Sequence, residues 1–341
     1  MEAQSVPSAV AIPWRERIRE SPAARAAARH PQWAAAGVIA LFVLYLVARY
    51  GVHDTAQTGL NGLSLGSVYA LGAVGLTLVY GILKLVNFAH GDFLTFGAFM
   101  AFLMNVSWGV PLVFAVVFGM AATALLGILF ERVMWGPMRA RKAGLLQLVL
   151  MSIGLGFVIR YTIQFAWGTR IRTLDVNSFA SVEFLGLRIG RTELIVIVVG
   201  FTVLVAVGLM LKYTLLGKQM RALSDNLDLA ETAGIDTSRV IFFTWLFAGA
   251  LAGLAGVLAG AVTDVRPEMG FNLLLPIFAA VVLGGIGDAF GALVGGIVLG
   301  VVIEWSTLFI DFRWKNAVGF AVLIGVLILR PQGIFGRARA V

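Results

Sequence analysis

The chain contains the run Gly59-Leu-Asn-Gly-Leu-Ser-Leu-Gly-Ser-Val-Tyr-Ala-Leu-Gly-Ala-Val-Gly-Leu-Thr-Leu-Val-Tyr-Gly-Ile-Leu83, which is 25 residues long and carries no charged side chain. A helix of about 20 apolar residues crosses the ~30 Å hydrocarbon core of a bilayer, so this run predicts a transmembrane helix. The whole chain has the same character, because 60% of its 341 residues are hydrophobic and only 13% are charged. Soluble domains carry about 25% charged residues. The mean hydropathy of +0.92 therefore indicates an integral membrane protein.

Nine further apolar segments accompany this run, and together they predict an all-α, polytopic membrane helix bundle. Several segments are close to the lower limit of about 17 residues, notably the eighth and the tenth. We therefore expect about eight to ten transmembrane or half-spanning helices. In chain order the ten segments are Trp33–Ala48, Gly59–Leu83, Phe88–Met104, Val110–Phe130, Leu145–Trp167, Glu193–Leu211, Val240–Val262, Leu273–Gly287, Ala289–Trp305 and Ala317–Leu329.

The positions of the basic residues predict the orientation of the bundle. Residues 1–32 form a tail rich in Pro and Arg, which we interpret as cytoplasmic, either free or lying on anionic lipid. Residues 33–341 form the transmembrane domain. Basic clusters follow the fourth and sixth segments and close the chain, and cytoplasmic loops favour Lys and Arg. Both termini are then cytoplasmic, and the loop Gly168–Thr192 lies outside although it holds four arginines.

Glycines four residues apart recur among the 40 glycines of the chain. Two glycines at this spacing share one helix face and let a second backbone come close, so they predict tightly packed helices. A loose similarity between Gly62–Gly81 and Gly284–Gly300 is explained either by two related halves or by the general glycine enrichment of membrane helices, and we favour the second explanation. The candidates for helix packing or hinges are Gly62, Gly66, Gly284, Gly285, Gly287 and Gly291.

The sequence Asn87-Phe-Ala-His-Gly-Asp92 brings three polar side chains to the start of the third segment. Polar groups within a membrane need partners or water. In one interpretation, Asn87, His90 and Asp92 line a substrate path or bind a zwitterion. In the other, which we favour, they lie at the cytoplasmic membrane boundary, cap a helix and fix a turn. We expect no metal site, because the two other histidines stand at no ligand spacing and the chain has no cysteine.

The segment Lys212–Arg239 is polar and lies on the predicted cytoplasmic side. Its apolar residues Met220, Leu223, Leu227 and Ala230 recur at spacings of three and four, which predicts a short amphipathic helix that ends before Gly234. Such a helix could dock into a groove of a cytoplasmic partner, or it could be a connecting helix packed on the base of the bundle. The residues alone leave these two interpretations equal.

The sequence lacks the common patterns of catalytic and nucleotide-binding sites. It has no Gly-x-x-x-x-Gly-Lys-Ser/Thr loop for phosphate, no Gly-x-Ser-x-Gly nucleophile turn and no His-Glu-x-x-His metal motif. We therefore expect no enzyme and no cofactor in this chain, and any ATP must be bound by another chain. The sequence Gly284-Gly-Ile-Gly-Asp288 is either a tight turn or a broken helix that exposes backbone groups to a substrate.

Several segments together resemble the permeases of branched-chain amino acid ABC transporters, in particular the smaller, LivH-type subunit. The resemblance rests on Asn61–Asp92, Gly217–Ile235, Pro267–Phe271, Phe278–Gly287 with Gly291-Ala292, and Arg330–Gly336, in this order. It implies the fold of an ABC importer permease, in which the region Lys212–Arg239 is the coupling helix that docks into an ATPase subunit. The residues that match the family pattern there are Gly217, Arg221, Ala222, Asp225, Asn226, Ala230, Gly234 and Ile235.

The resemblance further implies an importer built from several chains in the inner cell membrane. A second permease subunit completes the path, two cytoplasmic ATPase subunits bind ATP and Mg²⁺, and an extracytoplasmic solute-binding protein delivers branched-chain or other apolar amino acids. The lipid bilayer is an expected partner and nucleic acid is not. Two alternatives stay open: a permease for urea or short amides, and a passive facilitator that moves a small neutral solute without ATP.

Overall fold

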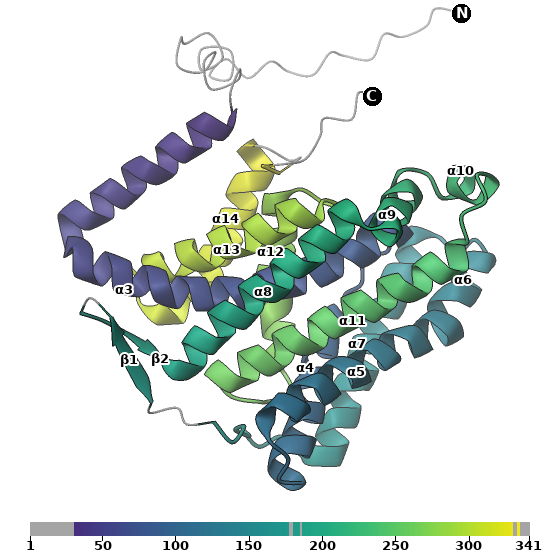
Figure 1. Cartoon of the computed structure of the whole chain (residues 1–341), viewed down its shortest axis with the longest axis horizontal. Coiled ribbons are helices and arrows are strands. Elements are labelled where there is room, and N and C mark those ends of the chain that lie inside the picture. Colours follow the sequence, from purple (N-terminus) through teal and green to yellow (C-terminus); the bar gives the residue numbers. More distant parts are fainter. Residues whose placement is uncertain (1–30, 177–179, 185, 330–332, 335–341) are drawn as a thin grey trace, which may run out of the picture. The chain divides into compact units, whose positions relative to one another are not determined.

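The computed structural model describes residues 31–176, 180–184, 186–329 and 333–334. Contacts divide the chain into two compact units, residues 1–55 and 56–341, and most of the basic tail predicted for residues 1–32 lies outside the described residues. The described chain is mainly helical (Figure 1). Its elements are α3 (Pro31–Leu83), α4 (His90–Phe102), η1 (Leu103–Ser107), α5 (Leu112–Phe130), η2 (Glu131–Trp135), α6 (Gly136–Ala140), α7 (Leu145–Trp167), β1 (Ser181–Phe184), β2 (Leu187–Gly190), α8 (Arg191–Tyr213), α9 (Leu215–Asp225), α10 (Leu227–Thr232), α11 (Thr237–Val262), α12 (Met269–Gly284), α13 (Ala289–Ser306), η3 (Phe312–Trp314) and α14 (Lys315–Leu329).

Six of the described helices are long and apolar enough to cross a membrane. They are α3 from Ala40 onward, α5 with its continuation to Ala140, α7, α8, α11 and α13. Helix α12 is apolar but has only 16 residues, and α4 and α14 have 13 and 15 residues. The fold is therefore the polytopic helix bundle that the sequence predicts. Helices α12 and α14 correspond to the eighth and tenth segments, which the sequence already places near the lower length limit.

Helix α3 runs through two segments that the sequence predicts as separate spans, Trp33–Ala48 and Gly59–Leu83. Its non-helical residue is Gly51, with φ 88° and ψ 163°, a conformation that glycine adopts without the steric cost of a side chain. The hydroxyl of Thr55 donates a hydrogen bond to the Gly51 carbonyl at 2.8 Å. Residues 52–58 contain neither Gly nor Pro, so no residue there ends the helix. The expected loop is thus reduced to a kink at one residue.

Helices of the second unit meet backbone to backbone where their facing residues are small. A Cβ atom at Gly62 would lie 2.6 Å from the Val301 Cα of α13, and one at Gly66 would lie 2.9 Å from the Ile297 Cα. In the same way, a Cβ atom at Gly97 of α4 would lie 2.5 Å from the Gly253 Cα of α11. These positions hold glycine because any larger residue would separate the helices.

The connection between α7 and α8 contains a small antiparallel hairpin, in which β1 pairs with β2 and Ser181 faces Gly190. The same connection is tied to the loop after α11 by two backbone hydrogen bonds between Arg172 and Val265, at 2.9 and 2.8 Å. Helix α8, with 23 residues, leads from the hairpin to α9. Figure 1 shows the hairpin and the α9–α10 segment near opposite ends of α8, so the predicted outer loop and the predicted cytoplasmic segment are one membrane span apart.

Candidate functional site

The connection between α3 and α4, residues Lys84–Ala89, turns back into the bundle. His90 at the start of α4 is buried, and its Nε2 donates a hydrogen bond to the Gly72 carbonyl oxygen at 2.9 Å. Gly72 lies eleven residues before the end of α3 at Leu83, which is about 16 Å along a helix. The structure therefore buries Asn87, His90 and Asp92 inside the bundle. Their position relative to the cytoplasmic membrane boundary stays a prediction.

Two side chains accept hydrogen bonds from backbone amides of this non-helical connection. The Asn87 Oδ1 accepts a hydrogen bond from the Ala89 amide at 3.1 Å, and the Ser152 Oγ of α7 accepts one from the Phe88 amide at 3.1 Å. Non-helical backbone within a membrane is tolerated only where such partners exist. Asn87 thus holds the turn before α4, while its Nδ2 is among the buried polar atoms that have no hydrogen-bond partner in the described part of the chain.

Asp92 forms a buried ion pair with Arg160, which lies within α7. The Arg160 Nε donates to Asp92 Oδ1 at 2.9 Å, and its Nη2 donates to Oδ2 at 3.1 Å, so the pair is bidentate. The side chains are only 11% and 2% exposed, respectively. Gly156 provides the space for this pair, because a Cβ atom there would lie 2.6 Å from Asp92 Oδ2. The pair joins the first turn of α4 to the interior of α7, two helices that are far apart in the sequence.

Arg160 belongs to a polar and small stripe on α7 that sequence reasoning missed. Its members, Ser152, Gly156, Arg160 and Gln164, are four residues apart and therefore share one helix face. Beyond the ion pair, the Gln164 Nε2 donates to Glu268 Oε1 at 3.2 Å. The available signal was a single arginine inside the apolar segment Leu145–Trp167, since intramembrane charges are rare and usually functional.

The first turn of α12 completes this region. The Arg160 guanidinium lies over the Phe271 ring, with its Cζ 4.4 Å from the ring centroid. Gly91 and Gly270 bring the N-termini of α4 and α12 into backbone contact, and the Gly270 amide donates to Thr95 Oγ1 at 3.0 Å. The ion pair therefore lies where the positive ends of two helix dipoles meet.

The predicted coupling segment consists of two helices, α9 and α10, where the sequence suggests one. Asn226 separates them with an extended backbone, and its side chain caps α10 by accepting a hydrogen bond from the Leu229 amide at 3.0 Å. Asn is among the residues that favour this capping position, which is why the break falls there. Met220, Leu223 and Ala230 are buried, whereas Leu227 is half-buried. One face of the segment is therefore packed against the chain itself.

The other predicted coupling residues lie at the ends and on the outer side of the same segment. Gly217 is buried against the backbone of Leu211, the carbonyl of which also accepts a hydrogen bond from the Arg221 guanidinium. Gly234 has φ +83°, and the Ile235 amide donates to the Ala230 carbonyl at 3.1 Å, which closes the helix in a Schellman-type turn. Ala222 is half-buried, and Arg221, Asp225 and Asn226 are exposed.

Lys84 connects the α9 helix to the unwound connection before α4. Its Nζ donates to the carbonyl oxygens of Gly81 at 2.7 Å and of Ser224 at 3.0 Å. A Cβ atom at Gly81 would lie 3.5 Å from Ser224 Oγ and 3.6 Å from the Gly287 carbonyl oxygen. The end of α3, helix α9 and the turn between α12 and α13 therefore meet at one point.

The residues Gly284–Asp288 form the turn between α12 and α13. Gly285 and Gly287 have φ values of +112° and +90°, which only glycine adopts readily. Asp288 caps α13, because its Oδ1 accepts hydrogen bonds from the amides of Phe290 at 2.9 Å and Gly291 at 3.1 Å. Gly284 and Gly291 face each other in backbone contact. Of the two interpretations that the sequence leaves open, the tight turn describes this geometry.

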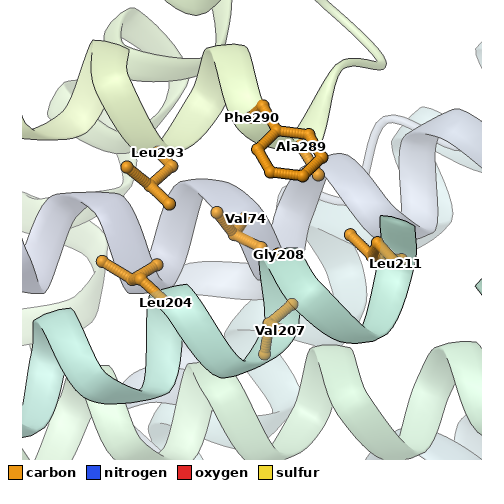
Figure 2. Close-up of a pocket in the computed structure, with 8 residues that line it drawn as sticks. All are labelled: Val74, Leu204, Val207, Gly208, Leu211, Ala289, Phe290 and Leu293. Carbon is orange, nitrogen blue, oxygen red and sulfur yellow. The ribbon is translucent and has the colours of Figure 1, made fainter. Parts of the chain in front are cut away.

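A separate hollow between α3, α8 and α13 is entirely apolar (Figure 2). Phe290 lies against Gly208, where a Cβ atom would be 3.0 Å from the ring. None of the eight lining residues offers a polar side chain to an amino or carboxylate group, so we assign the hollow to helix packing. The lining residues are Val74, Leu204, Val207, Gly208, Leu211, Ala289, Phe290 and Leu293.

The described chain is a polytopic helix bundle with a buried ion pair between two helices and an amphipathic helix pair at one end, and intramembrane charges of this kind commonly mark transport paths. A family model described as "Branched-chain amino acid transport system / permease component" matches residues 58–327 of this chain. The chain therefore belongs to the branched-chain amino acid permease family, which confirms the resemblance seen in its sequence.

Individual relatives are similar over most of their length. The high-affinity branched-chain amino acid transport system permease protein LivH of Escherichia coli (strain K12) is 35% identical over 82% of this chain and 95% of its own. The corresponding protein BraD of Pseudomonas aeruginosa is 33% identical over 84% and 97%. The fructose import permease protein FrcC of Rhizobium meliloti is 26% identical over 78% and 75%, so at lower identity the similarity extends to a permease named for a sugar.

Proposed function

We propose that this chain is the membrane-spanning permease subunit of an ABC importer for branched-chain or other apolar amino acids. Its family and the names of relatives at 33–35% identity support this proposal. A second permease subunit completes the translocation path, two cytoplasmic ATPase subunits bind and hydrolyse ATP, and an extracytoplasmic binding protein delivers the substrate. The complex lies in the inner cell membrane, with both termini of this chain in the cytoplasm.

The observation that carries the proposal is that α9 and α10 have one buried face and one exposed face. Their inner face is anchored through Met220 and Leu223, whereas their outer face exposes Arg221, Asp225 and Leu229. A helix that offers both charged and apolar groups on an exposed face fits a groove on a protein partner. In this proposal, the face binds a groove on the ATPase subunit.

Contacts of α9 lead from this face to the ion pair. Ser224 is joined to Lys84, and Lys84 begins the unwound connection that ends at His90 and Asp92. A displacement of α9 by the ATPase subunits therefore moves the start of α4 through a short non-helical segment. Such a segment absorbs backbone changes that a continuous helix resists. Alternating access then follows from the movement of closely packed helices around the path.

The test is uptake of labelled leucine into proteoliposomes that hold the chain with its partner permease and ATPase subunits and binding protein. We expect uptake only with ATP. Arg221→Glu reverses a charge on the docking face, and Gly234→Pro demands a φ near −65° where the native value is +83°. Both variants should insert and still hydrolyse ATP, but lose most coupled uptake. Arg132→Glu, at an exposed arginine outside the segment, is the matched control.

Three results would contradict the proposal at different levels. Leucine uptake by this chain without ATPase subunits would identify a facilitator. Uptake of urea or a short amide but not of apolar amino acids would show that the proposed substrate class is wrong. Normal coupled uptake in both variants would remove the docking role from α9 and α10.

A further inference from the structure

We infer that Arg160 and Asp92 bind the two charged ends of the transported amino acid, with the Arg160 guanidinium taking the α-carboxylate and the Asp92 carboxylate taking the α-ammonium group. This inference rests on the proposed function and assigns its substrate site to residues. It differs from the candidate set Asn87, His90 and Asp92, because the Asn87 Oδ1 and the His90 Nε2 are engaged with the backbone of the connection and of α3.

The ion pair has the charge pattern that a zwitterion requires. An amino acid carries one positive and one negative group on the same carbon atom, Cα, so inserting it between Asp92 and Arg160 replaces one ion pair by two and leaves the site neutral. A buried ion pair is a poor source of stability, since replacing it by apolar side chains often stabilises a protein. A bidentate pair deep in a helix bundle therefore indicates a task other than holding the helices together.

The surroundings of the pair fit an apolar side chain. Phe271 lies 4.4 Å from the guanidinium carbon and Phe157 lies 5.6 Å from it, so two rings flank the cation. Phe271 and Phe157 are 45% and 47% exposed, so both rings reach from the buried pair to the surface of the described chain. Branched aliphatic groups such as those of leucine, isoleucine and valine pack well against aromatic rings.

The first turn of α12 carries two further polar groups next to Phe271 in the sequence. Asn272, next to Phe271, is exposed although it lies in an apolar helix. Pro276 has no amide hydrogen, so the Asn272 carbonyl lacks the donor that an α-helix normally supplies four residues later. Arg160 is more exposed than Asp92, so the guanidinium is the more accessible of the two charged groups.

The test measures ligand binding by the full chain in its complex with the partner permease and ATPase subunits in nanodiscs. The binding protein is left out, because its own selectivity would mask that of the site. Four probes of similar shape differ only in charge: leucine, leucinamide as the cation, 4-methylpentanoate as the anion and 4-methylpentanamide as the neutral form. Their affinities are compared in the wild type, Asp92→Asn, Arg160→Gln and the double variant.

Each variant should prefer the probe that restores the neutrality of the site. The wild type prefers leucine. Arg160→Gln leaves the Asp92 charge uncompensated and prefers leucinamide, whereas Asp92→Asn prefers 4-methylpentanoate. The double variant prefers the neutral amide. We expect each preference to change by at least about tenfold relative to leucine, as for other removals of one partner of a buried charge pair.

A matched control is the ion pair in the loop between α11 and α12. Arg266 and Asp264 are also bidentate, with both nitrogen–oxygen distances 2.6 Å, but they lie in a loop and pair with each other two residues apart rather than between two helices. Arg266→Gln should keep the wild-type ranking of the four probes.

Two outcomes would overturn the inference. Variants that assemble and keep the wild-type ranking would show that the pair does not contact the substrate. An equal loss of affinity for all four probes would identify the pair as a structural contact between α4 and α7. If the single variants fail to assemble, the double variant decides, since it carries no unpaired charge and a retained preference for leucine would contradict the inference. A wild-type complex that binds no branched-chain amino acid would instead contradict the proposed function.

Discussion

Gly156 shows how strongly one residue controls the geometry of the ion pair. Its missing side chain leaves room for Asp92, so Gly156→Ala must displace either the carboxylate or helix α7. We expect this variant to lower leucine uptake by about tenfold and the free energy of unfolding by about 1–3 kcal/mol, as in other overpacked interiors. Uptake in proteoliposomes and the melting temperature of the purified complex are the measurements.

The control lies two residues away on the same helix. Gly154 has no atom within 4 Å of the position of an added Cβ atom. Gly154→Ala should therefore leave uptake unchanged and stabilise the helix by up to about 1 kcal/mol. Equal behaviour of the two variants would show that the space beside Asp92 has no special role.

The sequence identifies one half of the ion pair and misses the other. Asp92 stands out because it follows Asn87 and His90 at the start of an apolar segment. Arg160 lies 68 residues away, and no spacing rule connects it with Asp92. An arginine within an apolar span is itself a signal of function, but only the packing of α4 on α7 supplies its partner.

At the level of elements, the helices that hydropathy defines are predicted well. Helix α7 has the predicted bounds Leu145–Trp167, because Gly144 and Gly168 cap the apolar run at its two ends. The depth of the connection Lys84–Ala89 is not predictable in this way. It depends on the hydrogen bonds of His90 with α3 and of Phe88 with Ser152, which are tertiary contacts.

The crossing of α3 and α13 provides a test of the glycine packing. A Cβ atom at Gly300 would overlap the Gly66 backbone, so Gly300→Ala should lower the free energy of unfolding by about 1–3 kcal/mol. Gly325 of α14 has no atom within 4 Å of its added Cβ, and Gly325→Ala should leave stability unchanged or raise it by up to about 1 kcal/mol. The melting temperatures of the two variants are measured by thermal unfolding of the detergent-solubilised complex. Equal melting temperatures of the two variants would contradict a close crossing of α3 and α13 at this site.

For the whole molecule, the orientation in the membrane is a prediction that the lack of native cysteine makes easy to measure. Leu229 of α10 and Val182 of the β hairpin are both exposed, and each can be replaced by a single cysteine. If the basic loops are cytoplasmic, a membrane-impermeant maleimide added to intact spheroplasts should label Val182→Cys at once. It should label Leu229→Cys only after the membrane is permeabilised. The reverse pattern would invert the topology and exclude α10 as a contact for cytoplasmic ATPases.

The ion pair between α4 and α7 also sets an order of events during synthesis. Asp92 and Arg160 are separated by 68 residues, so at ~5–20 residues per second they leave the ribosome about 3–14 s apart. Throughout this interval α4, with 13 residues and an uncompensated carboxylate, has neither the length nor the counter-charge to remain in lipid. We therefore expect helix α4 to become stable in the membrane only after α7 has been synthesised, although α4 precedes α7 in the chain.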